Sequence, residues 1–515
     1  MFEVFTKRTF EGREFRMSKY ILSVDLGTTS TKTVLFDEKM KVVASARAEY
    51  PTVYPKQGWA EQDPEDWWKA LISTTEQILK ESGIDPAEIA GLGVDAMSSM
   101  ALPMDKEGKA LRNGLLWLDR RAQKESDWIR GTYGDLQKKI NSNDSDPSNF
   151  APKVLWMKNN EPEVYEKTAA FLHCNSYLVY RLTDKMSMDL SEAGMSQLCD
   201  IRTGQWSDEL IQASGIDKSK LPEIYACTDV VGGITAAAAA ATGLKEGTPV
   251  IAGAMDNVAA TLGLGLRHDG QAYISAGTAT NAGACMASVP SDPSMLNYHH
   301  AVPGLYLVNG GVDYGGAGLR WFKALIEEEN FEEIDRLAEE AGYLDDVLLY
   351  LPYMVGQRAP LWDPHSRAAA FGMNPDTSRK AMIRMIMEGI AMGVRNVFRM
   401  MEEKGYSIEE IVMTGGCANS PIWTQIFSDI LIKDIILPGE MDVAPLGTAI
   451  MTGVGIGLYP DFDSALAVQS VRAAHFPDKE KSDYYNALSK AFINLYEAVG
   501  PVYKELDDIR DKFQK

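Results

Sequence analysis

One carboxylate followed by small and hydroxyl residues stands in the first apolar stretch of the chain. In YILSVDLGTTSTKTVLF (residues 20–36), Asp25 precedes Gly27, Thr28 and Thr29. Glycine lets backbone N–H groups approach an anion, hydroxyls donate to phosphate oxygens, and a carboxylate can hold a hydrated divalent cation. This combination suits a nucleoside triphosphate, and the structural alternative is an ordinary hairpin turn rich in Gly and Thr.

A second aspartate follows another apolar run. In PVIAGAMDN (residues 249–257), Asp256 comes after alanines and glycines, so little would block a substrate from reaching its carboxylate. Such a carboxylate could accept a hydroxyl proton as that oxygen attacks a phosphorus atom. The alternative is a helix cap in front of residues 257–260.

The Gly-Thr turn recurs in the second half of the chain. In AYISAGTATNAG (residues 272–283), Gly277 and Thr278 separate two apolar runs, as Gly27 and Thr28 do earlier. Two such hairpins, about one in each half, indicate a duplicated domain in which both turns face the same phosphate chain.

A pair of glycines follows a later apolar run. In EIVMTGGCAN (residues 410–419), Gly415 and Gly416 precede Asn419, and a helix is expected to follow. A strand that opens into paired glycines lets a flat ligand lie against the backbone, which suits the adenine and ribose end of a nucleotide.

Candidate contacts for a polyol lie between the two aspartates. Ser98 and Ser99 come just past a predicted strand, where an open α/β sheet presents its ligand crevice. Trp117 and Asp119 pair an aromatic face with a carboxylate, which suits C–H groups and hydroxyls of a polyol. The alternative for this pair is a strand end with a solvated ion pair.

The candidate site residues are expected to be positioned by strands and helices that alternate along the chain. Apolar runs and turn residues predict strands and hairpins, Asp63-Pro64 predicts a helix start, and spacing of 3.6 predicts amphipathic helices. The expected elements are a hairpin over 20–45, a helix from 64 to about 82, a strand over 89–95, a short strand at 115–118, mainly helix over 149–182, a helix over 235–241, a strand over 249–256, a hairpin from 271, and a long helix over 383–401.

Length and charge limit the possible classes. With 515 residues and 56.7 kDa, the chain exceeds what one core usually serves, so at least two large domains are expected. The formal charge of −21 argues against nucleic acid or an anionic membrane as partner. Five scattered cysteines without a C-x-x-C pair indicate reduced thiols in a cytoplasmic protein, and no apolar run is long enough for a membrane span. Residues 1–16 are expected to form a disordered extension or to lie upstream of the start that translation uses.

Taken together, these motifs resemble the sugar kinases of the FGGY family, within the actin-like and hexokinase-like ATPases. The likeness runs from about Met17 to beyond Leu458 and depends on an ordered series of segments. It implies an α/β fold of two actin-like (ribonuclease H-like) ATPase domains, residues 17–258 and 259–515, that close on ligands in the cleft between them.

The resemblance also implies roles for single residues. Asp256 would be the catalytic base that takes the proton of the substrate hydroxyl, and Asp25 would position magnesium on ATP. The expected nucleotide contacts are Gly27, Thr28, Thr29, Gly277, Thr278, Gly316, Gly415, Gly416 and Asn419, and the expected sugar contacts are Ser98, Ser99, Trp117, Asp119, Asp256 and Asn257.

Within the family the chain resembles the xylulokinases, which implies phosphorylation of a pentulose such as D-xylulose. The chain departs from that likeness in the expected sugar pocket: Ser98-Ser99 stands where xylulokinases and some gluconate kinases have Met-His. Another polyol or sugar acid, such as ribulose, erythritol or gluconate, is the alternative acceptor. A non-enzymatic actin-like ATP-binding protein or a catalytically silent sugar sensor are the alternatives of another class, and a homodimer is implied by likeness alone.

Overall fold

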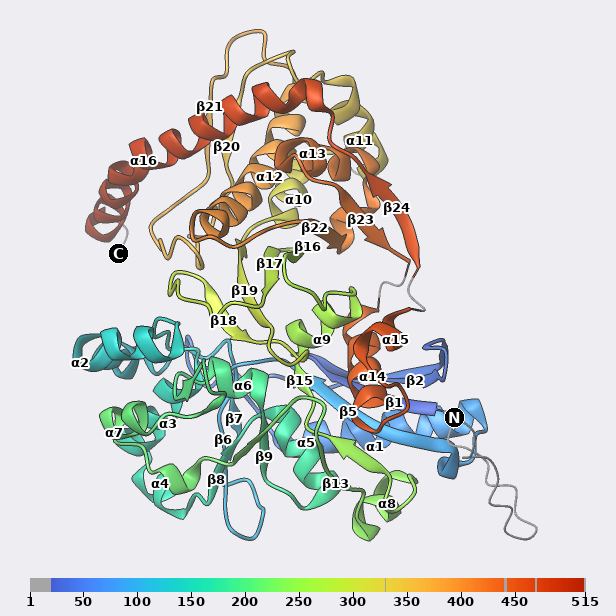
Figure 1. The fold of residues 1–515 in the computed structure, drawn as a ribbon. Helices are drawn as coiled ribbons and strands as arrows, with labels where there is room; N and C mark the ends of the chain where they lie inside the picture. The colour runs from blue at the N-terminus through green and yellow to red at the C-terminus, as the bar shows by residue number, and fades with distance from the viewer. Residues whose placement is uncertain (1–19, 329, 440–441, 468–469, 514–515) are drawn as a thin grey trace, which may run out of the picture.

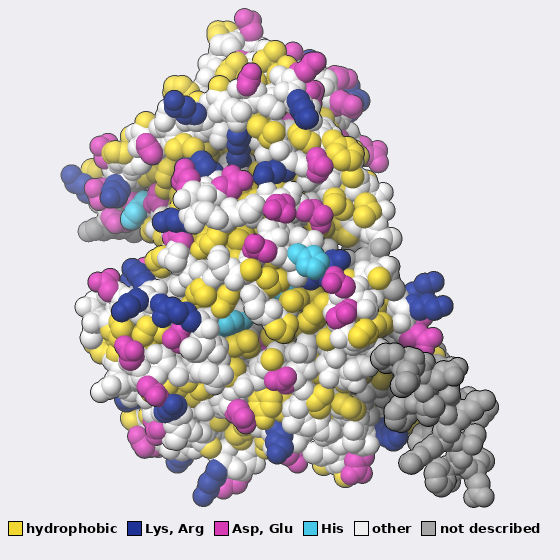
Figure 2. All heavy atoms as spheres, viewed as in Figure 1, with side chains coloured by type: hydrophobic (Ala, Val, Ile, Leu, Met, Phe, Trp, Pro, Cys, Tyr) yellow, Lys and Arg dark blue, Asp and Glu magenta, His cyan; other side chains and the backbone are white. Residues whose placement is uncertain are grey.

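Two mixed β-sheets form the centres of two α/β domains, one above the other in Figure 1. The computed structural model describes residues 20–328, 330–439, 442–467 and 470–513. The predicted extension at residues 1–16 lies outside the described residues. Figure 2 shows acidic side chains spread over the visible face of both domains, in keeping with the net charge of −21.

The first sheet combines an antiparallel meander with parallel strands. Its order is β13-β14-β5-β1-β2-β3, and β15 also pairs with β5. Strand β1 runs antiparallel to β2 and parallel to β5. The bounds are β1 Tyr20–Leu26, β2 Ser30–Asp37, β3 Val42–Glu49, β5 Ile89–Ala96, β13 Val230–Gly233, β14 Pro249–Ile251 and β15 Ala254–Met255.

The second sheet repeats this arrangement. Its order is β18-β19-β17-β16-β22-β23-β24, and β16 runs antiparallel to β17 and parallel to β22. The predicted duplication is therefore visible as two hairpins, β1–β2 and β16–β17, each with a parallel neighbour. The bounds are β16 Gln271–Ala276, β17 Thr280–Met286, β18 Leu296–His299, β19 Tyr306–Val312, β22 Glu410–Thr414, β23 Ile435–Pro438 and β24 Val471–His475.

Helices cover both sheets and fill the region beside the first one (Figure 1). Their bounds are α1 Pro64–Ser82, α2 Gln123–Asn141, α3 Phe150–Asn160, α4 Pro162–Lys167, α5 Cys174–Thr183, α6 Leu190–Met195, α7 Asp208–Ser214, α8 Ala236–Thr242, α9 Asp256–Gly263, α10 Gly316–Leu325, α11 Phe331–Glu340, α12 Arg379–Glu403, α13 Pro421–Leu431, α14 Val443–Gly455, α15 Phe462–Leu466 and α16 Ser482–Phe513.

Short two-stranded sheets are formed by pairs of strands that lie between these helices in the sequence. The pairs are β4–β7, β6–β8, β9–β12, β10–β11 and β20–β21. Their strands are β4 Glu61–Gln62, β6 Leu102–Met104, β7 Gly114–Leu115, β8 Ala170–Leu172, β9 Ser187–Asp189, β10 Cys199–Asp200, β11 Gln205–Trp206, β12 Glu223–Tyr225, β20 Leu349–Leu351 and β21 Ala369–Phe371.

The two faces of the first sheet have different partners. Leu22, Val24 and Leu26 of β1 belong to the apolar core that contains α1, whereas Ile21 belongs to the core that contains α9 and α14. Because side chains alternate along a strand, Asp25 points to the second face, toward α14. Helix α14 comes late in the sequence but packs against β1 and β5 of the first sheet.

Most of the predicted elements are confirmed. Helix α1 begins after Asp63, whose side chain accepts a hydrogen bond from the Glu65 N–H, and the hairpins, the strand at 89–95 and the long helix α12 are present. Two strand predictions were wrong in extent. The strand expected at 115–118 covers only Gly114–Leu115, and the strand expected at 249–256 is divided at Gly253, whose φ of 81° interrupts the ladder.

Candidate active site

Two aspartates lie side by side where β1 and β5 end. Asp25 and Asp95 are register partners in this parallel pair, and their carboxyl groups are hydrogen-bonding neighbours. Burial raises the pKa of Asp25 to about 6 and raises the pKa of Asp95 well above its ordinary value. Two carboxylates can be neighbours only if a proton or a cation is shared between them. Sequence reasoning missed Asp95, although a buried aspartate at the end of an apolar strand was a usable signal.

Helix α14 closes this face of the sheet. The Thr448 hydroxyl donates to Asp95 Oδ2 at 2.6 Å, and among the described residues Asp95 Oδ1 has no donor. A Cβ at Gly93 would lie 2.3 Å from Thr452 Oγ1, so this strand must carry glycine where the helix crosses it. The close packing places Thr448 within reach of Asp95 and keeps water from this side of the pair.

Asp256 is the first residue of α9 and lies partly exposed after β15. Its Oδ1 accepts a hydrogen bond from the Asn257 N–H at 2.6 Å. Burial and then the nearby negative charge of Asp25 raise the pKa of Asp256 to about 7. The carboxyl group is therefore close to half ionised near neutral pH, which is the property a general base requires.

The turn of the first hairpin is held by neighbouring side chains. The Gly27 N–H donates to the Ser30 carbonyl at 3.0 Å, and the Gln62 amide donates to the Thr28 carbonyl at 2.7 Å. The Trp117 indole N–H donates to Thr28 Oγ1 at 3.1 Å. Trp117 thus links the expected sugar side to the turn of the first hairpin. A phosphate contact by Gly27, Thr28 and Thr29 stays a prediction.

A cavity of about 540 Å³ lies at the second hairpin turn. Five predicted nucleotide residues line it together, although they come from three separate stretches of the chain: Gly277, Thr278, Gly316, Gly416 and Asn419. Its volume lies within the usual range for small-ligand sites. The structure therefore brings these five predicted residues together around one cavity, whereas the predicted contact Gly415 is not part of its lining.

Two glycines are required by the backbone of this cavity. Gly415 has a φ of 94°, and a Cβ there would lie 2.6 Å from the Ala276 carbonyl oxygen. A Cβ at Gly316 would lie 2.4 Å from the Gly277 carbonyl oxygen, which accepts the Gly316 N–H. These contacts bring the glycine loop and the start of α10 directly against the second hairpin.

The cavity also has lining residues that sequence reasoning missed. Phe331 is 49% exposed, which leaves an aromatic face available for stacking, and Arg320 adds a positive charge. Ser420 donates to Asp335 Oδ1 at 2.8 Å, which holds that carboxylate in the lining. No local motif marks Phe331, Arg320 or Asp335, because they lie on the helices α10 and α11 that only the fold brings here.

A buried lysine connects the loops that carry the expected sugar contacts Ser99 and Trp117. Lys153 is completely buried, and its ammonium donates to the carbonyl oxygens of Ser99 and Leu116 at 2.6 Å and to that of Ser148. Burial lowers the pKa of Lys153 to about 7. Ser99 adopts a φ of 58°, and its N–H donates to the buried Glu192 at 3.3 Å. Ser98 is partly exposed beside it.

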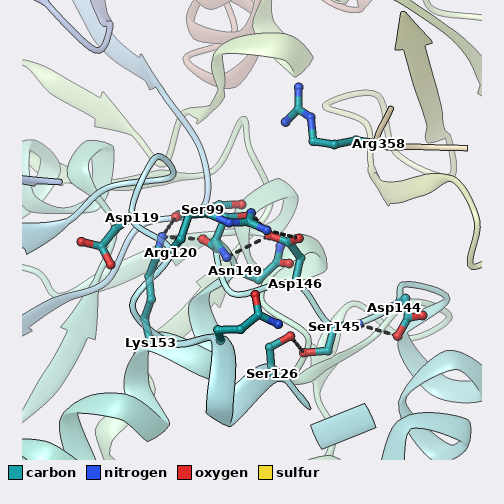
Figure 3. Close-up of polar contacts among 12 residues, drawn as sticks. Ser99, Asp119, Arg120, Ser126, Asp144, Ser145, Asp146, Asn149, Lys153 and Arg358 are labelled. Atoms are coloured by element: carbon teal, nitrogen blue, oxygen red, sulfur yellow. Dashed lines mark hydrogen bonds and ion pairs between the residues drawn. The ribbon is translucent and has the colours of Figure 1, made fainter. Parts of the chain in front are cut away.

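An ion pair lies beside this lysine (Figure 3). Arg120 donates to Asp146 through two bonds, Nη1 to Oδ1 at 2.6 Å and Nη2 to Oδ2 at 3.0 Å. The Arg120 guanidinium and hydrogen bonds from Ser148 hold the pKa of Asp146 below its usual value despite burial, which by itself would raise it. In the same view the side chain of Arg358, which belongs to the second domain, lies apart from the Arg120–Asp146 pair.

Sequence models of known families match both halves of the chain. The N-terminal domain model of the FGGY family of carbohydrate kinases matches residues 20–263, and the C-terminal domain model matches residues 272–456. The chain belongs to the FGGY family of carbohydrate kinases. It is therefore a carbohydrate kinase, and its two domains have the actin-like fold of that family.

Individual FGGY proteins are similar over nearly their whole length. The chain is 29% identical to the xylulose kinase of Bacillus subtilis (strain 168), over 93% of this chain and 97% of that protein. It is 27% identical to the gluconokinase of the same organism, over 96% of this chain and 98% of that protein. The crystal structure of xylulose kinase from Rhodospirillum rubrum matches with a TM-score of 0.89 and 26% identity, over 94% of this chain and all of that one.

Two expected sugar contacts of this FGGY kinase are occupied by protein partners. Asp119 is completely buried and accepts hydrogen bonds from the Ala60 N–H and the Arg121 guanidinium, both at 2.7 Å. The Asn257 side chain lies between two tyrosine hydroxyls, Tyr273 at 2.9 Å and Tyr298 at 2.8 Å. This geometry favours a role in holding the loops, because their polar atoms are already used. A direct sugar contact by either residue stays a prediction.

The residues around Asp25 fit a magnesium ion bound with a nucleotide. FGGY kinases use ATP as the phosphate donor. Magnesium prefers oxygen ligands and is usually held by one or two carboxylates, with phosphates and waters completing the octahedron. Among the described residues no group of three or more acidic, histidine or cysteine side chains is arranged to hold a metal alone. Asp25, with Asp95 as its hydrogen-bonding neighbour, supplies the carboxylate ligand type that such an ion requires.

No helix in the described ranges combines the length and the apolar character that crossing a bilayer requires.

Proposed function

We propose that this FGGY kinase transfers the terminal phosphoryl group of ATP to a hydroxyl of a pentulose such as D-xylulose. The observation that carries the proposal is Asp256, a partly exposed carboxylate with a pKa of about 7 at the start of α9, next to Asp25. A carboxylate in this position and protonation state suits removal of a hydroxyl proton during attack on phosphorus.

Each part of the site has a defined task in this reaction. Asp256 accepts the proton of the attacking hydroxyl. The hairpin turns at Gly27–Thr29 and at Gly277–Thr278 hold the phosphates from the two domains, so that attacking oxygen, phosphorus and leaving oxygen are in line. Domain closure excludes water, which limits hydrolysis of ATP. Magnesium, when bound on Asp25, neutralises charge on the phosphates.

The Arg120–Asp146 pair favours a neutral sugar over a sugar acid. A substrate carboxylate would need an unpaired cation, and Arg120 already makes two bonds to Asp146. A neutral polyol needs only hydrogen bonds, which partly exposed groups such as Ser98 can supply. The relatives include proteins named for xylulose and for gluconate, and the pairing of Arg120 with Asp146 supports xylulose as the acceptor.

We also propose a cytoplasmic location and a homodimer.

The first test is a substrate panel with purified protein and magnesium. ADP release would be measured with D-xylulose, L-xylulose, D- and L-ribulose, gluconate, glycerol, erythritol and fuculose. We expect strong stimulation by one pentulose and weak stimulation by gluconate. Preference for gluconate would overturn the argument from Arg120, and no stimulation by any pentulose would overturn the proposed acceptor.

A further inference from the structure

A second cavity lies in the C-terminal domain, away from the nucleotide cavity. It has a volume of about 290 Å³ and lies between the C-terminal half of α12, the N-terminal half of α16 and the end of α13. Strand β22 separates the two sites: Ile408, just before the strand, lines this cavity, whereas Gly416 beyond its other end lines the nucleotide cavity. The two cavities share no lining residue, so an occupant here would leave the ATP site open.

The lining is basic in a chain that is acidic overall. Arg395, Arg399, Lys433 and Lys490 line the cavity, and Glu402 is the one acidic residue of the lining. The whole chain carries a formal charge of −21. Four cations from α12, from α16 and from the turn between α13 and β23 therefore concentrate positive potential in one concave place, which attracts anions.

Two of these cations have no carboxylate within ion-pair distance among the described residues, although Glu402 lies near enough to Arg395 to interact with its charge. Arg399 pairs with Glu403, and Lys433 Nζ lies 3.5 Å from Glu402 Oε1. Among the described residues, Arg395 and Lys490 form no ion pair. An unpaired cation in a concave lining is the usual partner of a ligand anion.

Arg395 is also held rigidly in a half-buried place. Its guanidinium donates to the Tyr485 carbonyl at 3.0 Å and to the Asn486 side chain, both on α16. Burial lowers the pKa of Arg395, and the nearby carboxylate of Glu402 offsets only part of this shift. A bound anion would compensate this cost.

We propose that this cavity binds a phosphate group, either free orthophosphate or the phosphate of a small ester. Arg395 and Lys490 supply its charge partners, and Ser489, buried on the same wall, supplies a hydroxyl donor. The volume admits a compact ion or the phosphate end of a small molecule. The bound group bridges α12 and α16, so it stabilises the folded C-terminal domain.

The test uses the full chain with its catalytic site filled by magnesium and a non-hydrolysable ATP analogue, because phosphate would also bind at the hairpin turns. Thermal unfolding and titration calorimetry would be run with orthophosphate and with a small sugar phosphate, against chloride at matched ionic strength. We expect a concentration-dependent rise in Tm for at least one phosphate compound. The compound that binds more tightly identifies the source of the phosphate group.

Matched variants on α16 locate the site. Lys490 is exposed, and Lys490→Glu replaces its positive charge by a negative one. For this variant we expect the Kd for the phosphate compound to rise about tenfold or more. Lys504→Glu makes the same charge change farther along the helix, outside the cavity, and is expected to bind as the wild type does. Equal weakening by both variants, unchanged binding in Lys490→Glu, or no stabilisation of the wild type would overturn the proposal.

Discussion

Asp25 and Asp95 lie opposite each other at the carboxyl ends of the parallel strands β1 and β5, with their carboxyl groups in contact. Thr448 of α14 donates to the far oxygen of Asp95. The candidate magnesium ligand is therefore positioned by a second carboxyl group, which is itself positioned by a helix almost at the other end of the sequence.

Asp95 is expected to be a positioning residue for Asp25. In Asp95→Ala, Asp25 loses its neighbour, and we expect the magnesium concentration for half-maximal activity to rise about tenfold. Asp95→Asn is the matched control, since its amide can donate to Asp25 while its oxygen accepts from Thr448. Magnesium titrations of turnover and calorimetric binding of magnesium with ATP analogue would measure the effect. An unchanged magnesium requirement in Asp95→Ala would contradict this role.

Asp256→Asn is expected to lower turnover by ~100-fold or more while leaving ATP binding nearly unchanged, because the amide cannot accept the hydroxyl proton. Steady-state kinetics and calorimetric titration with an ATP analogue would separate the two effects. Asn257→Ala serves as a neighbouring comparison that keeps the carboxylate. Wild-type turnover in Asp256→Asn would show that the proton goes elsewhere.

The pH dependence of kcat/KM is expected to report Asp256. Its pKa of about 7 lies above the ordinary 3.8, and the base must be deprotonated to act. Activity should therefore rise with pH through about 7 and fall by about tenfold per unit on the acid side. The same profile measured on Asp256→Asn should lose this limb. An acid limb near 3.8 would mean that the surroundings do not raise the pKa in the working enzyme.

Gly316→Ala is expected to weaken ATP binding. The new Cβ would lie 2.4 Å from the Gly277 oxygen and 2.9 Å from Cys417 Sγ, so the Gly277-Thr278 turn must move. We expect the KM for ATP to rise about tenfold or more, with a smaller change for the sugar. Gly318→Ala, on the same helix, meets its nearest atom at 3.6 Å and is the control. Equal KM values for ATP in both variants would argue against this close contact.

Asp146→Asn is expected to change the preference among acceptors. The substitution removes the charge partner of Arg120, so a substrate carboxylate could take its place. We expect the ratio of kcat/KM for gluconate to that for D-xylulose to rise about tenfold. Asp144→Asn, on the same loop but not paired with Arg120, is the control. An unchanged ratio would place Arg120 outside the acceptor site.

Local sequence was sufficient for much of the fold. The Asp63-Pro64 cap, the two Gly-Thr hairpins and the spacing of α12 depend on neighbours within a few residues, so their signals are short-range. The strand at 115–118 was overestimated because the Leu116 carbonyl accepts a hydrogen bond from the buried Lys153 ammonium and not from a neighbouring strand.

The sequence by itself determined which residue types the candidate site contains, because chemistry and backbone geometry restrict which residues can stand there. These are the aspartates after apolar strands, the two Gly-Thr turns and the paired glycines. The tertiary structure alone decided which of them are free to meet a ligand. The hydrogen-bonding capacity of Asp119 is used by Arg121 and Ala60, whereas Arg320 and Phe331 reach the cavity from helices that no local pattern marks. Such roles depend on contacts between distant segments, and burial and pairing of a side chain are properties of the packed chain.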